Sequence, residues 1–173
     1  PNYYVSTYGV GLQTASLLTA LFIFPASLLR PLGGWLSDLY GPRKVTYGVF
    51  IGMILALVPL CLPASMLQLN IAGFTLLLIT VAIGMGIGKA SVYKYIQNYF
   101  PQDVGAVGGL VGLLGALGGF ILPKTFGHLA RTTGYPQAAF LALLILTTLS
   151  LTWLHGVVLT SRRPQPTPAW QTN

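Results

Sequence analysis

Residues 33–44 read GGWLSDLYGPRK, and this short polar segment lies between two long apolar runs. It carries a motif of five residues at fixed spacing: Gly34, Asp38, Gly41, Arg43 and Lys44. A small residue at the first position lets neighbouring helices approach closely, and Gly41 permits a tight turn. Asp38 is expected near a helix terminus or against a basic side chain at the same membrane face. We therefore interpret the segment as a basic loop that joins two membrane helices.

The composition of the chain excludes a soluble fold. Of its 173 residues, 54% are hydrophobic and only 6% are charged, whereas a soluble domain carries about 25% charged residues. Nine Lys and Arg against two acidic residues give a formal net charge of +7. Basic residues in cytoplasmic loops account for this excess without nucleic acid as a partner. The predicted fold class is an all-α membrane protein.

The sequence predicts neither catalysis nor a metal site. Cys61 is the single cysteine, so there is no disulfide framework. The chain has no nucleophile–base pair, no cluster of metal ligands and no phosphate-binding loop after a strand. His128 is expected in an outer loop and His155 near the cytoplasmic surface, and neither is expected in a proton relay.

Apolar runs of about 20 residues span a bilayer as helices, and the chain has about five of them. The predicted helices cover residues 14–37, 45–62, 70–99, 104–122 and 137–159. Residues 1–13 are short and aromatic, and we interpret them as the outer end of a preceding helix. Residues 1–160 are expected to form one membrane domain. The polar, proline-rich residues 161–173 are expected to form a disordered cytoplasmic tail.

Basic residues in the loops predict the orientation of the chain. Arg43 and Lys44 place the first loop in the cytoplasm, and two arginines after residue 160 place the C-terminus there as well. The loop between the second and third helices has no charge, which suits the outer side. Lys124 and Arg131 then fall on the outer side, where basic residues are less common. Most of the basic residues favour this orientation, and these two oppose it.

Arg30 lies inside the first predicted helix, where a charge costs roughly 2.5–3.5 kcal/mol on insertion scales. Asp38 follows eight residues later, about 12 Å along a helix, which is too far for a direct ion pair. The planar guanidinium suits oxyanions, so Arg30 either binds an anion or has a snorkelling or structural role. Pro25 and Pro31 flank it and form either a static kink or a hinge.

The fourth predicted helix carries a stripe of glycines at spacings of four, three and four: Gly108, Gly112, Gly115 and Gly119. This spacing places them on one face of a helix. A face without side chains either packs closely against another helix or exposes its backbone to a central cavity. The spacing alone leaves both interpretations open.

The motif in residues 33–44 resembles the loop motif of the major facilitator superfamily, which joins helices two and three and recurs between helices eight and nine. At the second position, it makes residues 14–37 the eighth helix and the last predicted span the twelfth. The resemblance implies the C-terminal bundle of a twelve-helix transporter, with the N-terminal six-helix half as its partner. The chain begins without Met, which we interpret as a start within a longer protein.

Three segments are similar to the nitrate/nitrite porter family of this superfamily: FPASLLRPLGGWLSD (24–38), GIGKASVYKYIQNYFP (86–101) and VGAVGGLVGLLGALGGFILP (104–123). The resemblance implies transport of nitrate and/or nitrite across the cell inner membrane by alternating access, without a cofactor. The lack of a mid-membrane carboxylate suits exchange of the two anions, and proton symport remains open because the N-terminal half could carry the relay. By matching positions, Arg30 would bind the anion, Tyr93 would stack on it, and the four glycines of the stripe would line its path.

Lys89 departs from this family, several members of which have asparagine at the corresponding position. It either adds positive charge to the pathway or snorkels to the cytoplasmic interface. Lys94 lies closer to that interface and is expected to be an anchor there.

Two other functions remain open from the residues. A facilitator carrier of another small organic anion or a drug would have a roomier cavity around Arg30. A transport-dead membrane fragment would instead act as a scaffold for partners.

Overall fold

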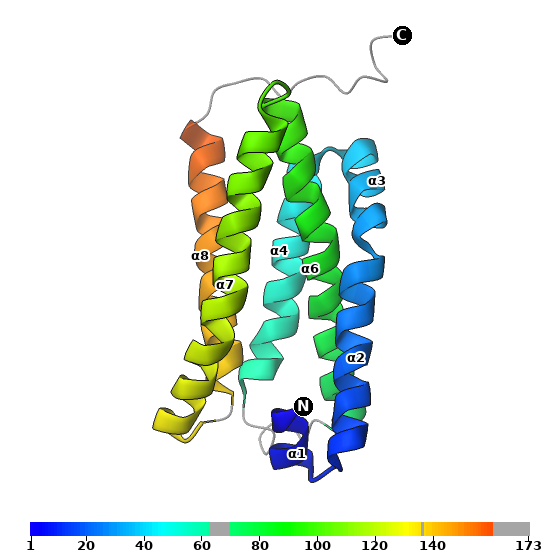
Figure 1. Ribbon diagram of the computed structural model, residues 1–173, viewed down its shortest axis with the longest axis vertical. Coiled ribbons are helices and arrows are strands. Elements are labelled where there is room, and N and C mark those ends of the chain that lie inside the picture. Colours follow the sequence, from blue (N-terminus) through cyan, green and yellow to red (C-terminus); the bar gives the residue numbers. More distant parts are fainter. Residues whose placement is uncertain (63–69, 136, 161–173) are drawn as a thin grey trace.

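All elements of the described chain, residues 1–62, 70–135 and 137–160 of a computed structural model, are helices. Their bounds are α1 (Asn2–Tyr8), α2 (Leu12–Leu28), α3 (Arg30–Tyr40), α4 (Pro42–Cys61), α6 (Ile71–Tyr99), α7 (Val104–Thr133) and α8 (Ala138–Thr160). They form an elongated bundle in which α3 continues α2 along one edge (Figure 1). α2, α3, α6 and α8 run in one direction, and α4 and α7 run in the other.

Four helices are long and apolar enough to cross a membrane: α4, α6, α7 and α8. Together, α2 and α3 pass the same test as a broken span that is bent by 41°. The predicted all-α membrane fold with about five transmembrane helices is therefore confirmed. The predicted tail, residues 161–173, lies outside the described residues.

The span predicted over residues 14–37 consists of two helices, because the chain breaks at Leu29 between α2 and α3, next to the predicted kink. Pro31 has no N–H to donate within a helix, and it disfavours the helical conformation of the residue before it. α2 also begins at Leu12, so the last residues of the stretch 1–13 belong to this helix and not to the preceding one.

α7 is longer than the predicted helix over residues 104–122. It continues through Pro123 and stops before Gly134, whose φ of 64° is left-handed. Proline is tolerated in membrane helices because neighbouring groups and local adjustments satisfy the freed backbone. The sequence places His128 in an outer loop and Lys124 and Arg131 on the outer side of the membrane. All three residues lie on the last turns of this helix.

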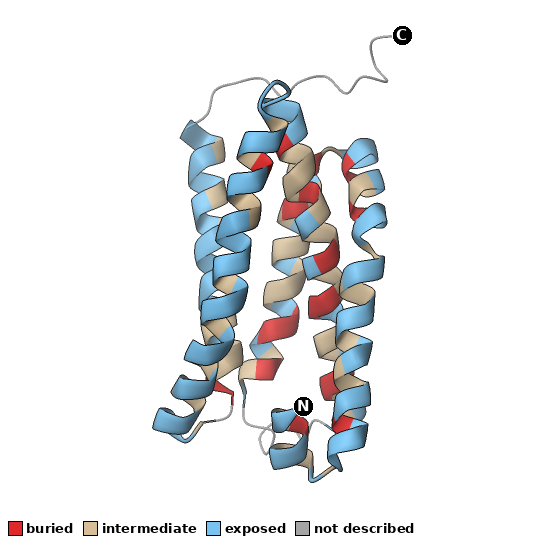
Figure 2. Cartoon of the chain, viewed as in Figure 1, coloured by how far each residue is buried: buried red, intermediate tan, exposed pale blue. Residues whose placement is uncertain are grey.

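α6 is the centre of the bundle and packs against α2, α3 and α4. Two of its contacts bring backbones together. A Cβ atom on Gly86 would lie 2.6 Å from the carbonyl oxygen of Ala26, and one on Gly33 would lie 2.6 Å from that of Ile87. Buried residues gather on α4 and α6, whereas α7 and α8 are mostly exposed (Figure 2). α4, α6 and the contacts that the broken helix makes with α6 therefore form the closely packed part of the bundle.

Hydroxyl groups hold α4 against α6. The Oγ1 atom of Thr46 and the Oγ atom of Ser91 are 2.8 Å apart, and the Ser91 hydroxyl also lies 2.8 Å from the carbonyl oxygen of Pro42. Both side chains are buried. Such hydrogen bonds between helices stabilise membrane bundles where apolar burial alone discriminates little between protein and lipid.

Candidate functional site

Arg30 is the first residue of α3, directly after the break, and its side chain is exposed. On one side of it, Ala26 meets α6 at Gly86. On the other side, a Cβ atom on Gly33 would lie 3.0 Å from the Cβ atom of Ala90. α3 and α6 run in the same direction, so these contacts place Arg30 level with the stretch of α6 between Gly86 and Ala90. This level is close to the middle of the α6 span.

The helix break that carries Arg30 is anchored on both sides. The Leu29 N–H donates to the carbonyl oxygen of Pro25 at 3.0 Å, and the Gly33 N–H donates to that of Leu29 at 3.2 Å. The backbone contacts with α6 lie just before and just after these bonds. A rotation about Leu29 would have to separate the backbone contacts between the broken helix and α6. These contacts therefore favour a static kink over a hinge at Pro25 and Pro31.

Tyr93 joins α6 to the glycine stripe of α7. Its Cε1 atom lies 3.6 Å from the position of a Cβ atom on Gly108, and its hydroxyl oxygen lies 3.3 Å from that position on Gly112. The structure thus brings together three of the predicted site residues, and the two glycines are the surface on which the tyrosine ring rests.

The other half of the stripe is open. No described atom beyond the local helix lies within 4 Å of a Cβ position on Gly115 or Gly119. The glycine stripe therefore divides into a part that packs, as the first interpretation holds, and a part that exposes a bare backbone face, as the second holds. No contact between these open glycines and Arg30 is present in the described residues.

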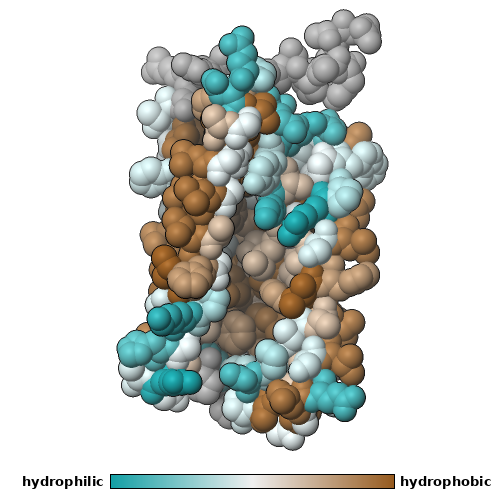
Figure 3. Space-filling view, viewed as in Figure 1, coloured by the Kyte–Doolittle hydropathy of each residue, from teal (hydrophilic) through white to brown (hydrophobic). Residues whose placement is uncertain are grey.

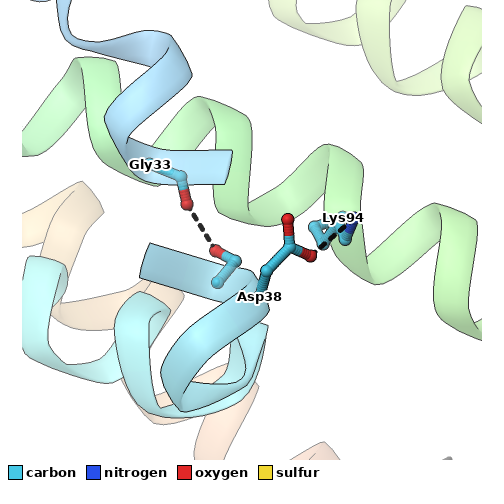
Figure 4. A network of polar contacts seen from close by, with 4 residues as sticks. Gly33, Asp38 and Lys94 are labelled. Atoms are coloured by element: carbon cyan, nitrogen blue, oxygen red, sulfur yellow. Dashed lines mark hydrogen bonds and ion pairs between the residues drawn. The ribbon is translucent and has the colours of Figure 1, made fainter. Parts of the chain in front are cut away.

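The two lysines of α6 have different surroundings. The Nζ atom of Lys94 lies 2.7 Å from Oδ1 of Asp38 on α3 (Figure 4), and the neighbouring Ser37 hydroxyl donates to the carbonyl oxygen of Gly33 at 2.7 Å. Asp38 thus pairs with a basic side chain, as predicted. Lys89 is exposed and has no ion pair within the described part of the chain.

Among the described residues, the glycines of the loop motif differ in their surroundings. Gly41 has a φ of 84°, which favours glycine, and it separates α3 from α4. Nothing described lies within 4 Å of a Cβ position on Gly34, and the tight helix contact falls on Gly33 instead. Arg43 and Lys44 lie in the first turn of α4.

The face of the bundle formed by α7, α6 and the broken helix combines these features (Figure 3). Hydrophilic side chains gather in its upper half over α6 and α3, and the flanks are hydrophobic. The exposed charged residues in that region of the two helices are Arg30, Asp38 and Lys89. Positive side chains are therefore exposed on α3 and α6 in this region.

Sequence reasoning missed the glycines that position Arg30. Gly33 and Gly86 make the backbone contacts on either side of it. The available signal was the run GMGIGKA at residues 84–90, where glycines recur inside an apolar helix at a cost in helix propensity.

The described residues contain no group of three His, Cys, Asp or Glu side chains that could hold a metal ion. Nδ1 of His155 lies 3.0 Å from the hydroxyl oxygen of Tyr47, so this histidine joins α8 to α4. His128 is exposed on α7.

Comparison with known proteins identifies the class of this protein. Residues 1–172 match the Major Facilitator Superfamily. The chain therefore belongs to this superfamily of membrane transporters, and it is not an enzyme.

Individual relatives carry more specific names. The probable nitrate/nitrite antiporter NarK1 of Thermus thermophilus is 50% identical in an alignment that covers 92% of this chain and 39% of the relative. The probable nitrate transporters NarT of Staphylococcus haemolyticus and Staphylococcus aureus N315 are 35% and 34% identical over 84% of this chain and 36% of their own length. No solved structure gives a significant match. The chain thus spans less than two fifths of these curated relatives.

Proposed function

We propose that this chain is the C-terminal half of an alternating-access carrier of nitrate and nitrite, and that Arg30 binds the anion. The observation that carries the proposal is the placement of Arg30. It lies at a helix break near the middle of the span, and its side chain is exposed. The names of the relatives give the substrate class.

Arg30 would bind the anion through its guanidinium, because parallel N–H donors match the geometry of a planar oxyanion. The anchored break would keep these donors in place while the carrier changes state. Tyr93 would offer its ring to the flat face of the anion. Gly115 and Gly119 would let the anion pass close to the backbone, since no side chain projects there.

The proposal includes a second, preceding half. Carriers with alternating access rock two halves about a site near the bilayer midplane. Arg30 and its face would meet the second half across the substrate. Exchange of nitrate for nitrite is the coupling that we propose, since the two acidic residues of this chain lie away from the level of Arg30.

We further propose an inner-membrane location with the C-terminus in the cytoplasm. Arg43 and Lys44 support this orientation through the excess of basic residues in cytoplasmic loops. Lys124 and Arg131, on the last turns of α7, would then stand at the outer surface.

The test uses the full-length protein that contains this chain, reconstituted in liposomes loaded with nitrite. Labelled nitrate is added outside, and initial exchange rates are compared for the wild type, Arg30→Lys and the control Arg131→Lys. Lysine keeps the charge but loses the planar array of donors. We expect exchange to collapse in Arg30→Lys and to persist in the control, which changes an exposed arginine far from the break.

Normal exchange by Arg30→Lys would remove this residue from the binding site. A correctly folded wild type that takes up no nitrate but does take up an organic anion would favour the broader facilitator function. Absence of transport for every anion would favour a scaffold.

A further inference from the structure

We infer that Lys89 is a second cation of the anion site, and that it supplies attraction where Arg30 supplies orientation. The inference rests on the proposed function, because it assigns a further residue to the same site. Three observations carry it: the level of Lys89, the helix face on which it lies, and the different surroundings of Lys94.

The contacts of α6 with the broken helix fix the level. Arg30 lies level with α6 between Gly86 and Ala90, and Lys89 is within that stretch. The two cations therefore share one depth on neighbouring helices. Lys89 is ten residues before the end of α6 at Tyr99, about 15 Å along the axis. To snorkel to the end of α6, the Lys89 side chain would have to reach about 15 Å along the axis, whereas Lys94 lies about 8 Å from that end.

The spacing along α6 fixes the face. Lys89 and Tyr93 are four residues apart, so they lie one above the other on the same side of the helix. Tyr93 points at Gly108 and Gly112 of α7. The side of α6 that carries Lys89 is therefore the side that faces the glycine helix, and its side chain is exposed there.

The surroundings separate Lys89 from Lys94. Lys94 is neutralised by Asp38 at 2.7 Å. The second carboxylate of the chain, Asp103, lies before the first residue of α7, and it forms no ion pair with Lys89 in the described residues. In the described residues, the positive charge of Lys89 thus has no carboxylate at its level, and an anion held by Arg30 would provide one.

The two side chains would act differently on the anion. An ammonium is a compact charge with rotatable donors, whereas a guanidinium fixes a planar partner in two places. Loss of the Lys89 charge should therefore weaken binding more than it slows the movement of bound anion. Arginine at this position should preserve the attraction.

The experiment compares Lys89→Gln and Lys89→Arg with the matched control Lys94→Gln, all in the full-length carrier. Nitrate exchange is measured in liposomes over a range of nitrate concentrations. We expect Lys89→Gln to raise KM about tenfold, as the loss of one charge-assisted contact does, with little change in kcat. Lys89→Arg should restore KM. Lys94→Gln should leave KM unchanged and lower Tm.

A KM for Lys89→Gln close to that of the wild type would overturn the inference, and so would an equal rise of KM in Lys94→Gln.

A second measurement does not depend on transport. The Tm of the detergent-solubilised carrier is followed with added nitrate, nitrite, chloride or acetate.

Stabilisation of the wild type by an anion other than nitrate, lost in Lys89→Gln, would support Lys89 even if the nitrate proposal fails. Equal stabilisation of both proteins, or none of the wild type by any of these anions, would reject it.

Discussion

α6 and α7 are both long, apolar, glycine-containing helices, but their glycines have opposite surroundings. On α6, Gly86 meets the backbone of α2, and Gly84 and Gly88 meet side chains of α4. On α7, Gly115 and Gly119 meet no described atom beyond the local helix within 4 Å. Glycine therefore serves close packing in α6, whereas in α7 it packs only at Gly108 and Gly112 and leaves a free surface at Gly115 and Gly119. The same residue type at similar spacing has two uses, and the neighbouring helices determine which.

The largest expected effect is on folding, from a side chain placed in the α2–α6 contact. Gly86→Leu would drive its Cβ atom to within 2.6 Å of a backbone oxygen that has no room to move. Overpacking of this kind costs about 1–3 kcal/mol or more. We expect little monodisperse protein in size-exclusion chromatography, whereas Gly115→Leu should elute like the wild type. Normal elution of Gly86→Leu would break the contrast between the two helices.

The second effect is on transport without loss of folding. Gly115→Leu adds an apolar side chain to the open face of α7, where it would obstruct an anion passing the backbone. An obstruction that costs about 1–3 kcal/mol lowers the rate about 5-fold to 160-fold. Initial exchange rates in liposomes, normalised to folded protein, check this prediction. An unimpaired Gly115→Leu carrier would show that the anion passes elsewhere.

The third effect concerns Tyr93, the residue where α6 and α7 meet. Tyr93→Ala removes the ring from Gly108 and Gly112 and should destabilise the carrier by about 1–3 kcal/mol, less than for a fully buried aromatic residue. Hydrogen exchange should rise in α7 and not in α4. Tyr40→Ala, which removes an exposed ring at the end of α3, is the control. A uniform rise across all helices would contradict a local contact.

The smallest effect is expected from the ion pair that joins α3 to α6. The side chains of Lys94 and Asp38 are 30% and 52% exposed, and solvent screens such pairs to about 0–1 kcal/mol. A double-mutant cycle of Asp38→Asn and Lys94→Gln, read as Tm at low and high salt, isolates the pair. We expect a small coupling that vanishes at high salt. A coupling of several kcal/mol would contradict this ranking, because the ion pair would then contribute as much stability as the α2–α6 contact at Gly86.

The sequence predicted the membrane spans well because apolar length is a local property. Each of the last four predicted helices begins within about three residues of its observed start, a margin common at helix ends. The broken span was harder to predict. Pro25 and Pro31 both lie in the first run, but Pro25 lies inside α2, whereas the chain breaks at Leu29, two residues before Pro31.

The candidate site was predicted as a set of residue types and only partly as an arrangement. The pairing of Tyr93 with the glycine stripe depends on where two helices approach, and spacing along one helix does not report this. The same limit applies to Gly33 and Gly34: the motif singles out Gly34, and only the position of the partner helix shows that the close contact falls on Gly33. Arg30 was found from its cost in the membrane alone.

The length of α7 sets a relation between this bundle and the lipid around it. Its apolar part, residues 104–123, is about 30 Å long, which matches the thickness of a bilayer hydrocarbon core. The helix then continues for about another 15 Å with Lys124, His128 and Arg131 on it. With residues 104–123 in the hydrocarbon core, this extension would stand among the phospholipid head groups, where its positive charges would favour anionic lipids. A thicker bilayer would bring these charges into the hydrocarbon core. The length of the apolar part of α7 therefore limits the range of membrane thickness that the bundle spans without the energetic cost of hydrophobic mismatch.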